Sequence, residues 1–244
     1  MNQRVALITG GAKGIGRGIA LDLAAQQSRI AICYRTSEAA AQQTAQDITT
    51  RGGEALVIRC DVSDPVASKN LVAQVEQTWG RIDVLINGAG PYHRINLFDE
   101  TVAGWNEMFD GNLHPIFYLA RAVAPGMKAR KVGRIISFSM ANADQMEAQP
   151  DVTGHYIAKA GVLILTRTLA KLLAPYGITV NAISPGFIDS GSAPPQELAA
   201  MTKRIPAGYI GTVDDTIAAV RYLLSEEARY VNGANIQISG AWGI

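Results

Sequence analysis

The stretch VALITGGAKGIGRGIALDLA at residues 5–24 decides the fold of this chain. It is typical of a short apolar strand, a glycine-rich turn and the start of an amphipathic helix. Gly10 lets the chain leave the strand sharply, Gly14 lets a diphosphate approach the backbone, and Gly16 lets the helix pack closely on the strand. The helix would begin with free N–H groups and a partial positive charge facing the phosphates. The stretch predicts a dinucleotide-binding turn, and an ordinary tight turn is the alternative.

Short apolar segments rich in β-branched residues alternate with helical patterns along the whole chain. Because these segments are apolar without a break, both faces of each strand would be buried, as in a parallel sheet. We therefore expect one α/β domain over residues 1–244, with a Rossmann-like, doubly wound, seven-stranded parallel sheet flanked by helices. The expected strands are 5–8, 29–33, 55–59, 84–86, 134–138, 178–183 and 235–238, and the expected helices lie near 15–27, 37–51, 65–79, 100–129, 155–173 and 213–225.

The stretch 184–212 is irregular and rich in proline and glycine. A connection of that length inside a compact domain usually has a function. We expect it to act as a lid over the substrate.

Composition and charge limit the classes of function. Apolar residues make up 48% of the chain and charged residues 18%, which suits a sizeable core, and the net charge of +1 favours neither a nucleic-acid surface nor a membrane surface. No run approaches the ~20 apolar residues of a membrane span, and the first residues lead directly into a strand without a leader. Cys33 and Cys60 lack metal-ligand spacing, which indicates free thiols and a cytoplasmic protein. The isolated imidazoles His93 and His114 predict no metal site.

Five motifs occur in order along the chain. They are Thr9-Gly10 with Gly14-Ile15-Gly16; Asp61-Val62; Asn87-Gly88-Ala89-Gly90; Asn112; and Pro185-Gly186 with Ile188. Together they resemble the short-chain dehydrogenase/reductase family over nearly all 244 residues. In the order given, the resemblance implies a cofactor loop, an adenine-contacting pair, the family's Asn-Asn-Ala-Gly signature, a relay asparagine and a turn that fixes the nicotinamide. Residues 205–211 and 230–240 are similar to 3-oxoacyl-(acyl-carrier-protein) reductases, so the implied reaction interconverts a carbonyl and a secondary alcohol.

The end of the second expected strand bears on the choice of cofactor. NAD-specific dinucleotide folds place a carboxylate there, which repels a 2′-phosphate. The segment Cys33-Tyr34-Arg35-Thr36-Ser37 has no acid, and Arg35 is able to pair with a phosphate as a fork. Lys13 is a second cation on the same side. In the family this pattern accompanies NADP(H), which we expect here; ordinary surface charges are the alternative.

The expected catalytic centre departs from the family's pattern. Family members have a tyrosine four residues before a lysine, and the lysine holds the ribose and lowers the phenol's pKa so that the phenol exchanges a proton with the substrate. In Gly154-His155-Tyr156-Ile157-Ala158-Lys159, Tyr156 stands three residues before Lys159, and His155 occupies the four-residue position. The two positions differ by about 100° around a helix. The family's substrate-binding serine is displaced as well, because Met140 stands at its place and Ser139 one residue earlier.

Three interpretations of this centre remain open. In the first, the helix begins with an adjusted turn and Tyr156 still reaches the carbonyl. In the second, His155 is the proton donor, although the charge of Lys159 favours its neutral form. In the third, the chain binds NADP(H) but has lost fast chemistry and serves as a sensor or partner subunit. In the catalytic interpretations, Ser139 or a polar group of the loop 141–154 holds the substrate oxygen, and Asn112 anchors a relay water.

The helix expected at 155–173 is apolar on nearly every face. A helix without a polar face needs cover on both sides, and the preceding helix has a similar excess of apolar residues. Family members pair these two helices across a subunit interface. The resemblance therefore implies a homo-oligomer, a dimer or tetramer, that acts on a small-molecule ketone or alcohol.

Overall fold

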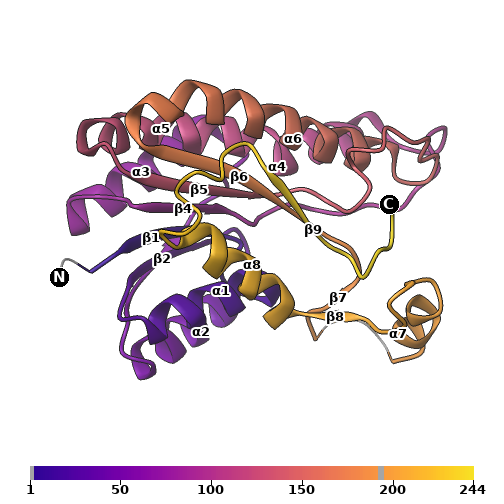
Figure 1. Ribbon diagram of the computed structural model, residues 1–244, viewed down its shortest axis with the longest axis horizontal. Helices are drawn as coiled ribbons and strands as arrows, with labels where there is room; N and C mark the ends of the chain where they lie inside the picture. Colours follow the sequence, from indigo (N-terminus) through magenta and orange to yellow (C-terminus); the bar gives the residue numbers. More distant parts are fainter. Residues whose placement is uncertain (1–2, 192–194) are drawn as a thin grey trace.

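The seven-stranded parallel sheet predicted from the sequence forms the centre of the molecule (Figure 1). The structure is a computed structural model that describes residues 3–191 and 195–244. The sheet has the strand order β3-β2-β1-β4-β5-β6-β9, and every neighbouring pair is parallel. Its strands are β1 (Val5–Thr9), β2 (Arg29–Tyr34), β3 (Glu54–Arg59), β4 (Val84–Asn87), β5 (Gly133–Phe138), β6 (Ile178–Pro185) and β9 (Asn235–Ile238).

Helices cover both faces of this sheet (Figure 1). One face carries α1 (Gly14–Ala25), α2 (Glu38–Thr50) and α8 (Val213–Leu224). The other carries α3 (Pro65–Trp79), α4 (Val102–Asn112), α5 (His114–Arg130) and α6 (Thr153–Leu173), which a short 3₁₀ turn (Ala174–Tyr176) follows. Among the described helices, none combines the length and the apolar composition that crossing a membrane would require.

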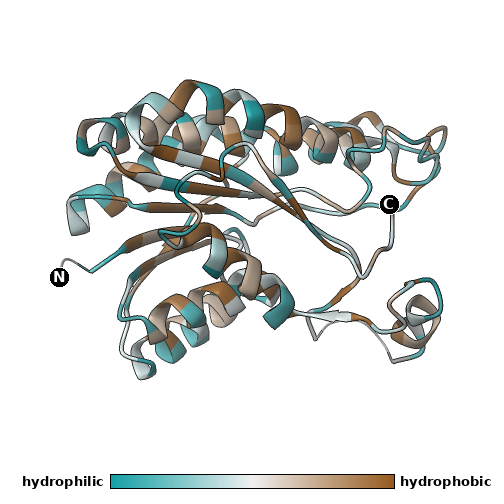
Figure 2. Cartoon of the chain, viewed as in Figure 1, coloured by the Kyte–Doolittle hydropathy of each residue, from teal (hydrophilic) through white to brown (hydrophobic). Residues whose placement is uncertain are grey.

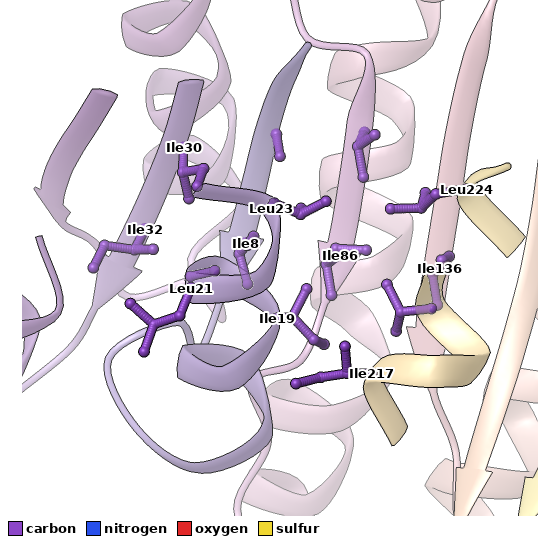
Figure 3. Close-up of a cluster of buried hydrophobic side chains, with 14 of the residues drawn as sticks. Ile8, Ile19, Leu21, Leu23, Ile30, Ile32, Ile86, Ile136, Ile217 and Leu224 are labelled. Carbon is purple, nitrogen blue, oxygen red and sulfur yellow. The ribbon is translucent and has the colours of Figure 1, made fainter. Parts of the chain in front are cut away.

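The hydrophobic core lies between the sheet and each helical layer. The strands are the most hydrophobic part of the chain, whereas polar residues gather on the outer sides of the helices (Figure 2). On the α1 face, Ile8 of β1 and Ile86 of β4 pack with Ile19 of α1, and all three are at most 1% exposed (Figure 3). Burial on both faces is the physical reason why these strands lack polar alternation.

Two expectations about the elements were wrong in detail. The helix expected over 100–129 is two helices, α4 and α5, with Leu113 between them at φ −112° and ψ −52°. Pro115 follows in the first turn of α5, where its missing N–H and its ring disfavour continuation of α4.

The stretch 184–212, of which residues 192–194 lie outside the description, is also more regular than expected. It contains β7 (Ile188–Asp189), α7 (Pro195–Thr202) and β8 (Gly211–Thr212), and β7 pairs with β8 in parallel. The pairing of β7 with β8 brings the two ends of the stretch together. Helix α7, which lies between them in the chain, projects beyond the main sheet (Figure 1).

Candidate functional site

The glycine turn after β1 forms a closely packed cradle. Gly10 and Gly14 have positive φ angles of 69° and 53°, and a Cβ atom at Gly16 would lie 2.3 Å from the carbonyl oxygen of Gly10. The Thr9 hydroxyl accepts hydrogen bonds from the backbone N–H groups of Gly88 at 3.1 Å and Ala89 at 3.2 Å. The loops after β1 and β4 are therefore joined at the carboxyl edge of the sheet, where the chain order reverses and dinucleotides bind in such folds.

A groove of about 520 Å³ extends from this cradle across the ends of β2 and β3. Its walls are backbone and small side chains near the turn and polar side chains farther out. Seven of the predicted cofactor residues line it, namely Gly10, Lys13, Arg35, Asp61, Val62, Gly88 and Ala89.

The remaining predicted cofactor residues lie around this groove. Gly14 and Gly16 shape the turn, and Ile15 packs against the core beneath it. Asn87 is buried, and its Nδ2 donates to the Ser137 hydroxyl at 3.1 Å. Pro185, Gly186 and Ile188 line a second cavity farther along the edge of the sheet.

Charged groups occupy the outer end of the groove. The Arg35 side chain is 58% exposed, and its Nη2 lies 3.9 Å from Oε1 of Glu107. The other oxygen of Glu107 lies 3.3 Å from Nε2 of His93. Burial alone would raise the pKa of Asp61, but hydrogen bonds from Ser63 and the charge of Arg35 outweigh it and lower that pKa. Sequence reasoning missed Glu107, because a single acid on a helix carries no sign of which strand end it faces.

Lys159 and Asn112 are both buried, and neither is part of the described lining of the two cavities. Lys159 is 8% exposed, its Nζ donates to the Phe138 carbonyl at 2.9 Å, and burial lowers its pKa to about 8. The Nδ2 of Asn112 donates to the carbonyls of Pro91 at 2.9 Å and Met108 at 3.0 Å. Its Oδ1 is buried and has no partner among the residues that the structure describes. An acceptor held in this way is suited to bind a water molecule.

His155 lines the second cavity from the first turn of α6. Its ring packs edge-to-face on the ring of Tyr92, with centroids 5.0 Å apart and planes at 88°. Burial and the charge of Lys159 lower the pKa of His155 to about 4, and the Pro91 carbonyl opposes this shift. Within the described part of the chain, the buried Nδ1 atom has no hydrogen-bond partner. A neutral imidazole therefore lines the cavity, and its Nδ1 atom is buried without a partner.

Tyr156 does not occupy the place that the first interpretation gives it. Its hydroxyl donates to the Asn142 carbonyl at 2.7 Å and accepts from the Glu147 N–H at 3.0 Å. The side chain is 5% exposed and is absent from the described lining of both cavities. The phenol thus fastens the loop between β5 and α6.

Ser139 also faces away from the second cavity. Its hydroxyl donates to the Lys159 carbonyl at 2.7 Å, whereas the adjacent Met140 lines the cavity. The serine joins the end of β5 to helix α6, so it is not available to bind a substrate oxygen in this arrangement. Among the residues that the structure describes, no group of three or more His, Cys, Asp or Glu side chains could hold a metal ion.

Comparisons with known proteins cover almost the whole chain. A family model described as Enoyl-(Acyl carrier protein) reductase matches residues 10–241. A 3-oxoacyl-(acyl-carrier-protein) reductase from Synechocystis is 32% identical over 241 residues, covering 98% of this chain and 97% of the relative. The reductase of the same name from Staphylococcus aureus is 34% identical over 238 residues, covering 96% of each chain. The crystal structure of acetoin dehydrogenase from Salmonella typhimurium has a TM-score of 0.89 at 28% identity, covering 99% of this chain and 97% of that one.

The role of the Tyr156 hydroxyl leads to a prediction about stability. Tyr156→Phe leaves the Asn142 carbonyl and the Glu147 N–H without a partner, so the free energy of unfolding should fall by about 1–3 kcal/mol. Chemical denaturation measures this change, and Tyr230→Phe, at a side chain that is 98% exposed, serves as the matched control. An unchanged unfolding free energy in Tyr156→Phe would contradict the structural role.

Proposed function

The chain belongs to the short-chain dehydrogenase/reductase family, and on that premise we propose that it is an NADP(H)-dependent oxidoreductase in which His155 exchanges the proton with the substrate. The reaction interconverts a carbonyl and a secondary alcohol. The observation that carries this proposal is the position of His155, four residues before Lys159, with its ring in the lining of the second cavity. When bound, the cofactor supplies or accepts the hydride.

The residues present fit a nicotinamide dinucleotide. At Gly10 and Gly16 a Cβ atom would strike neighbouring backbone, so the glycines keep the turn tight, and Gly14 leaves its backbone open to a diphosphate. Asp61 and Val62 would contact the adenine, and Lys159 would hold the ribose next to the nicotinamide. The segment Pro185–Ile188 would hold the nicotinamide itself.

The charge state of His155 bears on the direction of the reaction. With a pKa of about 4, the imidazole is neutral at pH 7, and only about one molecule in a thousand carries the extra proton. A neutral ring accepts the proton of an alcohol more readily than it donates one to a carbonyl. The free Oδ1 of Asn112 would hold the water through which the proton leaves. We therefore propose that neutral His155 accepts the proton in alcohol oxidation and that its protonated form donates the proton in ketone reduction.

The alternative function is that of an NADP(H)-binding sensor or partner subunit without turnover. The observation in its favour is that Ser139 and Tyr156 are both committed to hydrogen bonds within the protein. Met140, at the serine's place, brings no hydrogen-bond donor to the cavity. Cofactor binding is common to both functions, so turnover alone separates them.

The cytoplasm is the compartment that we propose for this reaction. Cys33 and Cys60 are buried free thiols, a state that a reducing compartment preserves. The proposed partners are small ketones or alcohols, with 3-oxoacyl thioesters among them.

Replacement of His155 tests the proton-exchange role. His155→Gln should lower kcat by about 10²–10⁴-fold on a panel of secondary alcohols and ketones, because general acid–base catalysis contributes that much. Tyr156→Phe should stay within about 3-fold of the wild type, since its hydroxyl serves the loop. Loss of turnover in Tyr156→Phe alone would overturn the assignment, and absence of turnover in the wild type would favour the sensor.

The pH dependence follows from the lowered pKa of His155. Above pH 4 the ring is neutral, so kcat/KM for alcohol oxidation should show no inflection near pH 6.5. Ketone reduction needs the protonated ring, and its kcat/KM should rise by up to about 10-fold for each pH unit between pH 8 and pH 5. Initial rates in both directions measure these profiles. An oxidation rate that falls below pH 6.5 would indicate an ordinary histidine pKa.

Arg35 is the residue that we propose to select NADP(H). Arg35→Gln should raise the Kd of NADPH by about 10–100-fold, the equivalent of a lost charge-assisted hydrogen bond, and change the Kd of NADH by less than about 3-fold. Calorimetric titration of both cofactors measures the difference. The matched control is Arg59→Gln, because Arg59 is exposed at the end of β3 and is not part of the described lining of the groove. Equal losses for NADPH and NADH would contradict the proposal.

Exposed apolar side chains on α5 and α6 support a homo-oligomer. Phe117 is 47% exposed on α5, and Ile157 and Ile164 are 44% and 64% exposed on α6. Such a surface on two adjacent helices is typical of a subunit interface. We propose that two copies of the chain pair through this face.

Sedimentation velocity tests the oligomer. The wild type should sediment as a dimer or tetramer, and Ile164→Glu should shift it toward smaller species because it places a charge in an apolar interface. Gln46→Glu adds the same charge to an exposed position of α2 on the opposite layer and should leave the assembly unchanged. A monomeric wild type would refute the proposal.

A further inference from the structure

The second cavity has a volume of about 480 Å³ and is mostly apolar. That size suits a small-molecule ligand. Phe187 and Trp242 pack on one another in its wall as tilted rings, with centroids 4.6 Å apart and planes at 52°. His155 and Met140 lie in the same lining. The cavity therefore offers an aromatic surface to a ligand that reaches the proton-exchanging imidazole.

Two guanidinium groups from separate parts of the chain also line this cavity. Arg94 belongs to the loop between β4 and α4, Arg204 follows α7 in the stretch 184–212, and both residues are exposed to solvent. The Cζ atom of Arg204 lies 5.9 Å from the centroid of the Phe187 ring, a cation–π arrangement that directs this side chain onto the aromatic wall. The positive charge is thus part of the cavity.

Six arginines of the described chain form ion pairs with carboxylates, and these two do not. Arg17, Arg29 and Arg81 each bind a carboxylate at 2.6–3.1 Å. Over residues 3–191 and 195–244, neither Arg94 nor Arg204 forms an ion pair. Asp151 is the single acid in the described lining, and its Oδ1 lies 3.5 Å from the Asn96 amide nitrogen. The described lining therefore carries two arginines and one carboxylate, and neither arginine forms an ion pair with that carboxylate.

We propose that the substrate carries a carboxylate, which Arg94 and Arg204 bind while its apolar body packs on Phe187 and Trp242. The inference rests on the proposed function, since it places the reacting carbon of the same substrate at His155. An arginine fork binds a carboxylate by charge-assisted hydrogen bonds, and the apolar wall beside it packs on the body of the substrate. The substrate class is therefore a small oxo acid or hydroxy acid with an aromatic or aliphatic body.

Matched substrates test the role of charge in turnover. The wild type should use 4-oxo-4-phenylbutanoate at least about 10-fold better in kcat/KM than its methyl ester, which has the same body without the charge. Arg204→Gln and Arg94→Gln should each reduce this preference to about 3-fold or less, whereas Lys203→Gln should keep it. Lys203 is the matched control because it is exposed beside Arg204 and is not part of the described lining. Equal use of acid and ester by the wild type, or an unchanged preference in both arginine variants, would overturn the proposal.

A binding measurement separates this inference from the proposed function. Calorimetry on the protein saturated with NADP⁺ should show 4-phenylbutanoate binding at least about 10-fold more tightly than 4-phenylbutanamide, with the difference lost in Arg204→Gln. Neither compound has a ketone or an alcohol group to react, so the result is independent of turnover. Selective acid binding without turnover of any ketone would support the carboxylate site and refute the oxidoreductase. Turnover of ketones together with equal binding of the acid and the amide would support the oxidoreductase and refute the carboxylate site. A higher kcat/KM for an uncharged 3-oxoacyl thioester than for the free oxo acid would also overturn the proposed carboxylate site.

Discussion

The rotational position of helix α6 is the constraint on which the candidate site depends. Two hydrogen bonds fix it at the end of β5, one from Lys159 Nζ to the Phe138 carbonyl and one from the Ser139 hydroxyl to the Lys159 carbonyl. Adjacent residues of a helix point about 100° apart, and here His155 lines the second cavity whereas Tyr156 does not. With Lys159 held in this way, His155 faces the cavity and Tyr156 faces the loop between β5 and α6.

This arrangement changes the chemistry available at the cavity. The family pattern uses a phenol and a serine hydroxyl, whereas the present lining offers an imidazole and the thioether of Met140. Burial next to Lys159 keeps that imidazole neutral, which suits proton acceptance from an alcohol. Because no serine donates to the substrate oxygen, we propose that the two arginines at the cavity position the substrate instead.

The fold was predictable from the sequence because it depends on local patterns that agree with one another. The apolar run Val5–Thr9 and the glycine turn after it identify the first strand and helix, and the same alternation locates the rest of the sheet. The site was less predictable, because its contacts join residues far apart in the chain. No local signal shows that Glu107 meets Arg35, or that Tyr156 bonds to the backbone of residues 142 and 147. The spacing before Lys159 revealed the departure from the family pattern, but only the contacts of α6 distinguish which of its two first-turn side chains faces the cavity.

The titration of His155 tests the central claim most directly. The chain has three histidines, so its imidazole resonances are few enough to assign by NMR with His155→Gln as the reference. The account predicts that the resonance lost in that variant titrates near pH 4 and shifts when NADP⁺ and an alcohol substrate are added together. A His155 resonance that titrates near its ordinary pKa of about 6.5 and does not respond to substrate would contradict the account.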